Sequence, residues 1–121
     1  MTVGGLETIL EELDERYEFD ANGRLTHLRG EGILPRFVLG RAAEGCVWRF
    51  RADLAAEEVN ALSRLAAREP GFPIGGKSPV PPPERLVMIE RLLTSEGVVA
   101  EALREVLTRG GVEVAELWTI D

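Results

Sequence analysis

The sequence predicts an α+β fold, with a mostly antiparallel sheet of about five strands packed on one side by about four helices in the order α-ββββ-ααα-β. Three observations carry this prediction. Apolar residues recur at helical spacing near the amino terminus and through much of the region from 54 to 110. Two pairs of short apolar runs flank glycine-containing turns, and the segment 112–120 alternates between two faces. Successive strands joined by tight turns form antiparallel sheets, which helices then cover.

The first expected elements are a helix and a β-hairpin. From Leu6 to Tyr17, apolar residues share one helical face and acidic residues fill the other. The hairpin follows, with strands near 17–20 and 25–29. Its turn contains Asn22-Gly23, a pair that tolerates the positive φ angles of a two-residue hairpin turn.

A second hairpin is expected from the runs 36–41 and 46–52, which flank a loop that contains Gly45. Side chains on successive strand residues point to opposite faces, so one face of the second strand should lie in the core. The core face carries Cys46, Trp48 and Phe50, and the outer face carries Val47, Arg49 and Arg51.

Three helices and a strand should complete the chain. Asp53 is placed to cap a helix from about Leu54 to Arg68, and Pro83 suits the first turn of a helix that runs to about Thr94. A fourth helix is expected from near Gly97 to the Gly110-Gly111 pair, before the closing strand. The spacings predict these core residues: Trp48, Phe50, Leu62, Leu65, Ile89, Leu92 and Trp118.

Length and composition exclude several classes of function. A chain of 121 residues fits a single domain, 1–121, and its 45% hydrophobic and 29% charged residues are an ordinary globular balance. The net charge of -7 disfavours nucleic acid and anionic membranes as partners. One cysteine and one histidine make no zinc site, and we expect no metal and no cofactor. With no signal or membrane-spanning segment evident, we expect a cytoplasmic location.

The segment 70–83 is the one long loop that the sequence predicts, because it holds six of the seven prolines. From Gly71 to Ser78 it matches the phosphate-binding pattern G-x-x-x-x-G-K-[ST]. A working P-loop follows a buried strand and leads directly into a helix. Here a helix and Pro70 precede the match and Pro79 follows it, so we expect a proline-braced surface loop with Lys77 at its tip.

Three arginines are the other candidates for ligand binding. Arg49 and Arg51 lie two apart on the outer face of one strand, and Arg36 lies on its neighbour, so their guanidinium groups could converge on a carboxylate or phosphate. The alternative is that they pair with some of the 21 acidic residues or are simply solvated. The candidate ligand-binding residues are thus Arg36, Arg49, Arg51, Lys77 and Ser78.

No residue is assigned a catalytic role. His27 could act as a base, but no spacing places a partner near it, and a partly exposed strand histidine is the simpler interpretation. Cys46 is expected on the core face beside Trp48, where a thiol acts as a small hydrophobic group and should be slow to alkylate.

The runs 35–41 and 46–54, the following helix to Pro70 and the Pro-Pro-Glu-Arg-Leu sequence at 82–86 resemble the amino-terminal accessory region of some bacterial GNAT-family acetyltransferases. The resemblance covers residues 20–95. It implies an accessory or substrate-lobe module without the transferase half. The family's acyl-coenzyme A loop has no counterpart here, because Arg29-Gly30-Glu31-Gly32 departs from its pattern and lies between two hairpins. No catalytic residue of the family can be carried over.

Together these features predict a non-catalytic accessory or binding domain for a small anionic ligand or a protein partner, with a homodimer through the sheet edge as one form of partnership. The alternative is a small enzyme or acyltransferase-related protein. It would use the Arg49 and Arg51 face and the Lys77 loop to hold a substrate that carries phosphate or coenzyme A.

Overall fold

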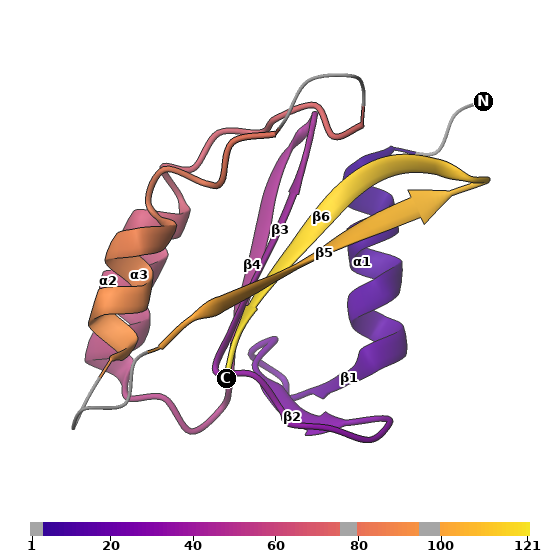
Figure 1. The fold of residues 1–121 in the computed structure, drawn as a ribbon. Coiled ribbons are helices and arrows are strands. Elements are labelled where there is room, and N and C mark those ends of the chain that lie inside the picture. The colour runs from indigo at the N-terminus through magenta and orange to yellow at the C-terminus, as the bar shows by residue number, and fades with distance from the viewer. Residues whose placement is uncertain (1–3, 76–79, 95–99) are drawn as a thin grey trace.

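The computed structural model describes residues 4–75, 80–94 and 100–121, which form an α+β fold (Figure 1). The order along the chain is α-ββββ-αα-ββ, which differs from the predicted order after the third helix. The elements are α1 (Gly5–Arg16), β1 (Tyr17–Phe19), β2 (Leu25–Leu28), β3 (Phe37–Ala42), β4 (Gly45–Phe50), α2 (Ala56–Ala66), α3 (Leu86–Leu93), β5 (Ala102–Arg109) and β6 (Val112–Ile120).

The strands form two antiparallel sheets. β1 and β2 make a two-stranded hairpin, and the other four strands form a sheet in the order β4-β3-β6-β5. β3 lies at the centre, where Phe37 pairs with Phe50 of β4 on one side and with Ile120 of β6 on the other. β4 and β5 are therefore the two edge strands.

Helices cover both faces of the four-stranded sheet, as Figure 1 shows with α1 on one side and α2 and α3 on the other. On the α1 side, Val38 and Leu117 pack with Ile9 and Leu13 of the helix. The opposite core is built from β3, β4 and β6 together with α2 and α3: its sheet residues are Phe37, Leu39, Phe50 and Ile120. Because both faces are covered, every residue of β3 is buried.

Gly40 explains how closely α1 approaches the sheet. A Cβ atom built on Gly40 would lie 2.5 Å from Cγ2 of Ile9, so no larger residue fits without a shift of the helix. Ile9 itself is fully buried. The glycine in the central strand is therefore a packing requirement of the α1 layer.

These findings correct the predicted architecture. The described residues contain three helices and six strands in two sheets, in place of about four helices on one side of a single five-stranded sheet. The predicted fourth helix is β5, which pairs with β6 through a turn at Gly110 and Gly111, whose φ angles are 60° and 80°. Two consecutive residues at positive φ form the tight turn of a hairpin, so the glycine pair marks a hairpin and not a helix end.

The predicted core is correct in part. Phe50, Leu62 and Ile89 are buried, and Trp48, Leu65 and Trp118 are half-buried against the same cluster. Leu92 is 54% exposed, so its assignment to the core was wrong.

Two helix starts also differ from prediction. Ala55, not Asp53, is the residue before α2, and Asp53 instead accepts a hydrogen bond from Nε of Arg51 at 2.6 Å. α3 begins at Leu86, three residues after Pro83.

Candidate anion-binding site

The β1–β2 turn and the edge strand β4 meet at the site. The carboxylate of Asp20 accepts hydrogen bonds from the amides of Asn22 at 2.9 Å and Arg24 at 3.0 Å, and Gly23 supplies the positive φ of 75° that closes the turn. The amide of Ala52 donates to the carbonyl of Leu25 at 2.9 Å, which ties the hairpin to the end of β4. These hydrogen bonds fix the conformation of the β1–β2 turn and hold it beside edge strand β4.

A hollow of about 340 Å³ lies between this turn, β4 and α2. We call it the Arg24–Arg49 hollow. The turn contributes Arg24, β4 contributes Trp48 and Arg49, and α2 contributes Val59 and Ser63. The full lining is Asn22, Gly23, Arg24, Trp48, Arg49, Phe50, Val59 and Ser63.

Arg49 also borders a second hollow of about 330 Å³ on the α1 side of the sheet, which Leu10, Leu13 and Asp14 help to line. Because β4 is an edge strand, its side chains can be reached around the edge from both faces. Arg49 thus stands between two surface hollows, one on each side of the sheet.

The guanidinium groups of the two arginines of the Arg24–Arg49 hollow have no carboxylate oxygen within 4.0 Å among the residues that the structure describes. Nη1 of Arg49 donates to the carbonyl of Trp48 at 2.8 Å, and the Arg24 guanidinium lies over the ring of Phe50, 5.9 Å from its centroid. Most N–H groups of both guanidiniums are therefore free to donate to a bound anion.

The other predicted arginines do not join Arg49. Nε of Arg36 donates to the main-chain oxygen of Asp121 at 2.6 Å, and its Nη1 donates to the carbonyl of Leu93 at the end of α3 at 2.9 Å. Arg51 pairs with Asp53 and also donates to the carbonyl of Leu34 at 3.2 Å. Each of these guanidiniums is held by its own partners, so the expected convergence of three arginines is not formed. Lys77 and Ser78 lie outside the described residues.

Sequence reasoning missed Asn22, Arg24 and Ser63 as neighbours of Arg49. The Asn-Gly turn was recognised, but nothing in the residues 20–24 indicates that the turn folds against β4. Ser63 belongs to a helix that reaches the same place from the other direction in the chain. Only a long-range contact brings the three segments together.

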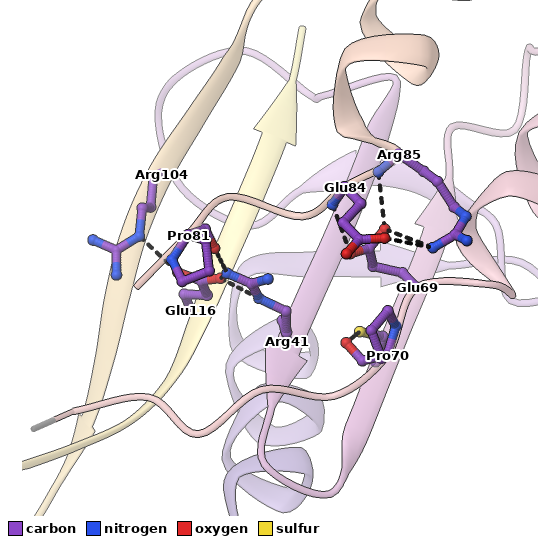
Figure 2. A network of polar contacts seen from close by, with 9 residues as sticks. Arg41, Glu69, Pro70, Pro81, Glu84, Arg85, Arg104 and Glu116 are labelled. Carbon is purple, nitrogen blue, oxygen red and sulfur yellow. Dashed lines mark hydrogen bonds and ion pairs between the residues drawn. The ribbon is translucent and has the colours of Figure 1, made fainter. Parts of the chain in front are cut away.

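A second polar cluster lies under the proline-rich loop, and Figure 2 shows how its side chains meet. The fully buried carboxylate of Glu116 on β6 accepts hydrogen bonds from Arg41 of β3 and from Nε of Arg104 of β5, the latter at 2.6 Å. Arg41 also donates to the carbonyl of Pro81, and its guanidinium lies 5.3 Å from the ring centroid of Phe72. The cluster holds the loop on the sheet, and its buried charges already have partners.

Glu69 makes a separate set of polar contacts at the start of α3 (Figure 2). Its carboxylate accepts hydrogen bonds from the amides of Glu84 at 2.8 Å and Arg85 at 3.0 Å, just before the helix begins. A negative charge at this position complements the helix dipole. The Glu69 carboxylate therefore already occupies the amides at the start of α3 that a ligand phosphate would need.

Cys46 and His27 are the two residues considered from the sequence as a nucleophile or a base. Sγ of Cys46 donates to the carbonyl of Pro70 at 3.4 Å. Burial, and after it the charge of Glu69, raises the pKa of the Cys46 thiol to about 11, so the thiol is protonated near pH 7. The side chain of His27 is 73% exposed, and its Nδ1 lies 3.4 Å from the carboxylate of Glu18.

Within the ranges given above, no three Cys, His, Asp or Glu side chains are grouped as a metal site would require. None of the described helices is long and apolar enough to cross a membrane. Comparisons with protein-family models, with curated proteins and with solved structures find no match to this chain. The resemblance to the GNAT accessory region stays a prediction.

Proposed function

We propose that this protein is a binding domain, without catalytic machinery of its own, that holds a small carboxylate or phosphate ligand in the Arg24–Arg49 hollow. The observation that carries the proposal is that two arginines border one hollow without a carboxylate partner in the described part of the chain. The chain has 21 acidic and 14 basic residues, so two guanidinium groups without an ion pair are not explained by a shortage of acids. An external anion would supply the missing charge.

The walls of the hollow indicate what else the ligand carries. Trp48 offers partly buried apolar surface and Phe50 and Val59 are buried in the wall, while Ser63 and Asn22 add a hydroxyl and an amide. Small-molecule sites are typically apolar depressions of about 300–1,000 Å³ with a few placed polar groups, and this hollow lies at the lower end of that range. The best fit is a small anion with a flat or apolar part that can lie against the aromatic side chains.

No observation favours the enzyme alternative. Its two proposed halves are the Arg49 and Arg51 face and the Lys77 loop. Arg51 is bound to Asp53, and Lys77 lies outside the described residues. Our proposal also includes an accessory role beside an acyltransferase and a cytoplasmic location.

The test is ligand binding by the full chain and by matched arginine variants. Thermal unfolding would be followed with inorganic phosphate, ATP, acetyl-coenzyme A and benzoate, and any hit would be measured by titration calorimetry. A ligand at about 100 times its Kd adds about 2.7 kcal/mol to the unfolding free energy, which raises Tm by on the order of 10 °C in a chain of this size.

Arg49→Gln and Arg24→Gln should each weaken binding by about ten- to a hundredfold, because each removes a charge-assisted hydrogen bond. Arg68→Gln is the matched control: it removes the same charge from an exposed residue outside the hollow. The proposal fails if none of the four probes binds at millimolar concentration. It also fails if binding survives both hollow variants unchanged.

A further inference from the structure

The helix α3 is apolar on nearly all sides, which is unusual for a helix at a protein surface. Its eight residues include only two charged ones. Leu86, Ile89 and Leu93 face the core and are buried. On the opposite side Val87, Met88 and Leu92 are 53%, 52% and 54% exposed.

The exposed apolar residues form one continuous stripe. Residues three and four apart lie on the same side of a helix, so Val87 and Met88 lie between Glu84 at one end and Arg91 at the other, with Leu92 alongside. We call these five residues the α3 outer face. A hollow of about 220 Å³ between Leu92 and Ala61 of α2 continues the apolar surface toward α2. Exposed apolar side chains that adjoin one another in this way make the α3 outer face a candidate interaction surface.

We propose that a second copy of this chain covers the α3 outer face and forms a two-fold symmetric dimer. The face is self-complementary. If two α3 helices pack antiparallel with the symmetry axis between Val87 and Met88, Val87 lies against Met88 of the partner subunit. The same axis places Glu84 opposite Arg91 of the partner subunit, and the reverse pair forms at the other end.

The charges at the two ends are available for this pairing. Arg91 is exposed and forms no ion pair within the described ranges. The Glu84 side chain is 77% exposed and has one loose contact, with its neighbour Arg85 at 3.6 Å. A second copy therefore supplies both an apolar cover and a counter-charge at each end, which an unrelated apolar surface would not.

The sheet edge is less suited to a dimer. The amide of Ala102, at the start of edge strand β5, already donates to the carboxylate of Glu90 at 3.1 Å. A symmetry axis at Arg104 or at Glu105 would bring like charges directly opposite each other, which is unfavourable, and at the middle of β5 only an axis at Val106 avoids this. The α3 outer face offers both apolar cover and matched charges, so we assign the second copy to this face in preference to the edge.

Sedimentation equilibrium of the full chain tests the proposal. The protein should self-associate with a dimer Kd below about 1 mM. Met88→Glu places a carboxylate at the centre of the apolar stripe in both copies and should weaken the dimer at least about a hundredfold. Leu103→Lys is the discriminating control, because Leu103 is 62% exposed on β5 and lies outside the α3 outer face. It should leave the dimer intact.

A charge exchange tests the register itself. Glu84→Arg alone and Arg91→Glu alone each place like charges at both ends and should weaken self-association about tenfold. A mixture of the two variants should restore association as a heterodimer, because each arginine then faces a glutamate. A monomeric wild type, a dimer that Leu103→Lys dissociates but Met88→Glu does not, or no recovery in the mixture would overturn the proposal. None of these residues lines the Arg24–Arg49 hollow, so the outcome is independent of anion binding.

Discussion

Replacing Glu116 by glutamine tests whether the buried ion cluster stabilises the fold. The change removes one negative charge from between Arg41 and Arg104 and keeps the size of the side chain. Arg41 is only 3% exposed and cannot turn its guanidinium to water, whereas the Arg104 side chain is 37% exposed and can. The variant therefore leaves a single buried charge, that of Arg41, without a counter-ion.

The loss of unfolding free energy in Glu116→Gln is set by the buried charge of Arg41, which no longer has a counter-ion. Removing one partner of a buried ion pair costs about 3–5 kcal/mol, because the remaining charge stays desolvated. Arg41 keeps its hydrogen bond to the Pro81 carbonyl and its contact with the Phe72 ring, and the amide of the substituted side chain would still offer one acceptor oxygen. We therefore expect a loss near the lower end, about 3 kcal/mol. Domains are stable by only about 5–15 kcal/mol, so this is a large share.

Urea unfolding followed by circular dichroism measures the loss. Glu105→Gln is the matched control on the same hairpin: Glu105 pairs with Arg16, but its side chain is 53% exposed, and the loss should stay below about 1 kcal/mol. Replacing both Arg41 and Glu116 by methionine should recover most of the stability, since a buried pair can be exchanged for apolar side chains at little cost. The reasoning is refuted if Glu116→Gln and Glu105→Gln lower the unfolding free energy equally.

The remaining predictions concern Cys46 and Gly40. Because the pKa of the Cys46 thiol is raised from 9.0 to about 11 in the folded state, alkylation by iodoacetamide at pH 8 should be slower than in urea, and rapid native labelling would contradict this. The same shift stabilises the fold below pH 9 and is lost as the pH rises toward 11, so the unfolding free energy of wild type should fall more steeply there than that of Cys46→Ala. Gly40→Ala should lower the unfolding free energy by about 1–3 kcal/mol, since its Cβ would overlap Ile9. Adding Ile9→Ala to Gly40→Ala should then cost less than Ile9→Ala costs alone, and strictly additive losses would argue against the overlap.

Local patterns predicted much of the fold in the first half of the chain. The amphipathic spacing of α1 and the Gly-containing turns depend on a few neighbouring residues, and the structure has a helix and two hairpins there. The first hairpin closes through residues 20–24, however, and not through the predicted two-residue turn at Asn22-Gly23. The pattern at 102–109 favoured a helix because Leu103, Val106 and Leu107 fit helical spacing, while the charged Glu105 interrupts the apolar alternation of a strand at 103, 105 and 107. Pairing with β6 across the Gly110-Gly111 turn decides for the strand.

The α+β class and the local turns could be predicted from the residues, because φ preferences and spacing act over a few positions. The residues alone could not show which faces of the sheet and of the helices are covered, because coverage depends on where elements distant in the sequence pack. Long-range packing placed α1 against one side of the sheet and left Leu92 of α3 exposed on the outer side of the other layer. It also gave Arg51 and Arg36 partners and left Arg49 beside Arg24 in a hollow. A side chain's partners are set by proximity in three dimensions. The sequence around residues 24, 49 and 63 does not indicate that these residues lie close together.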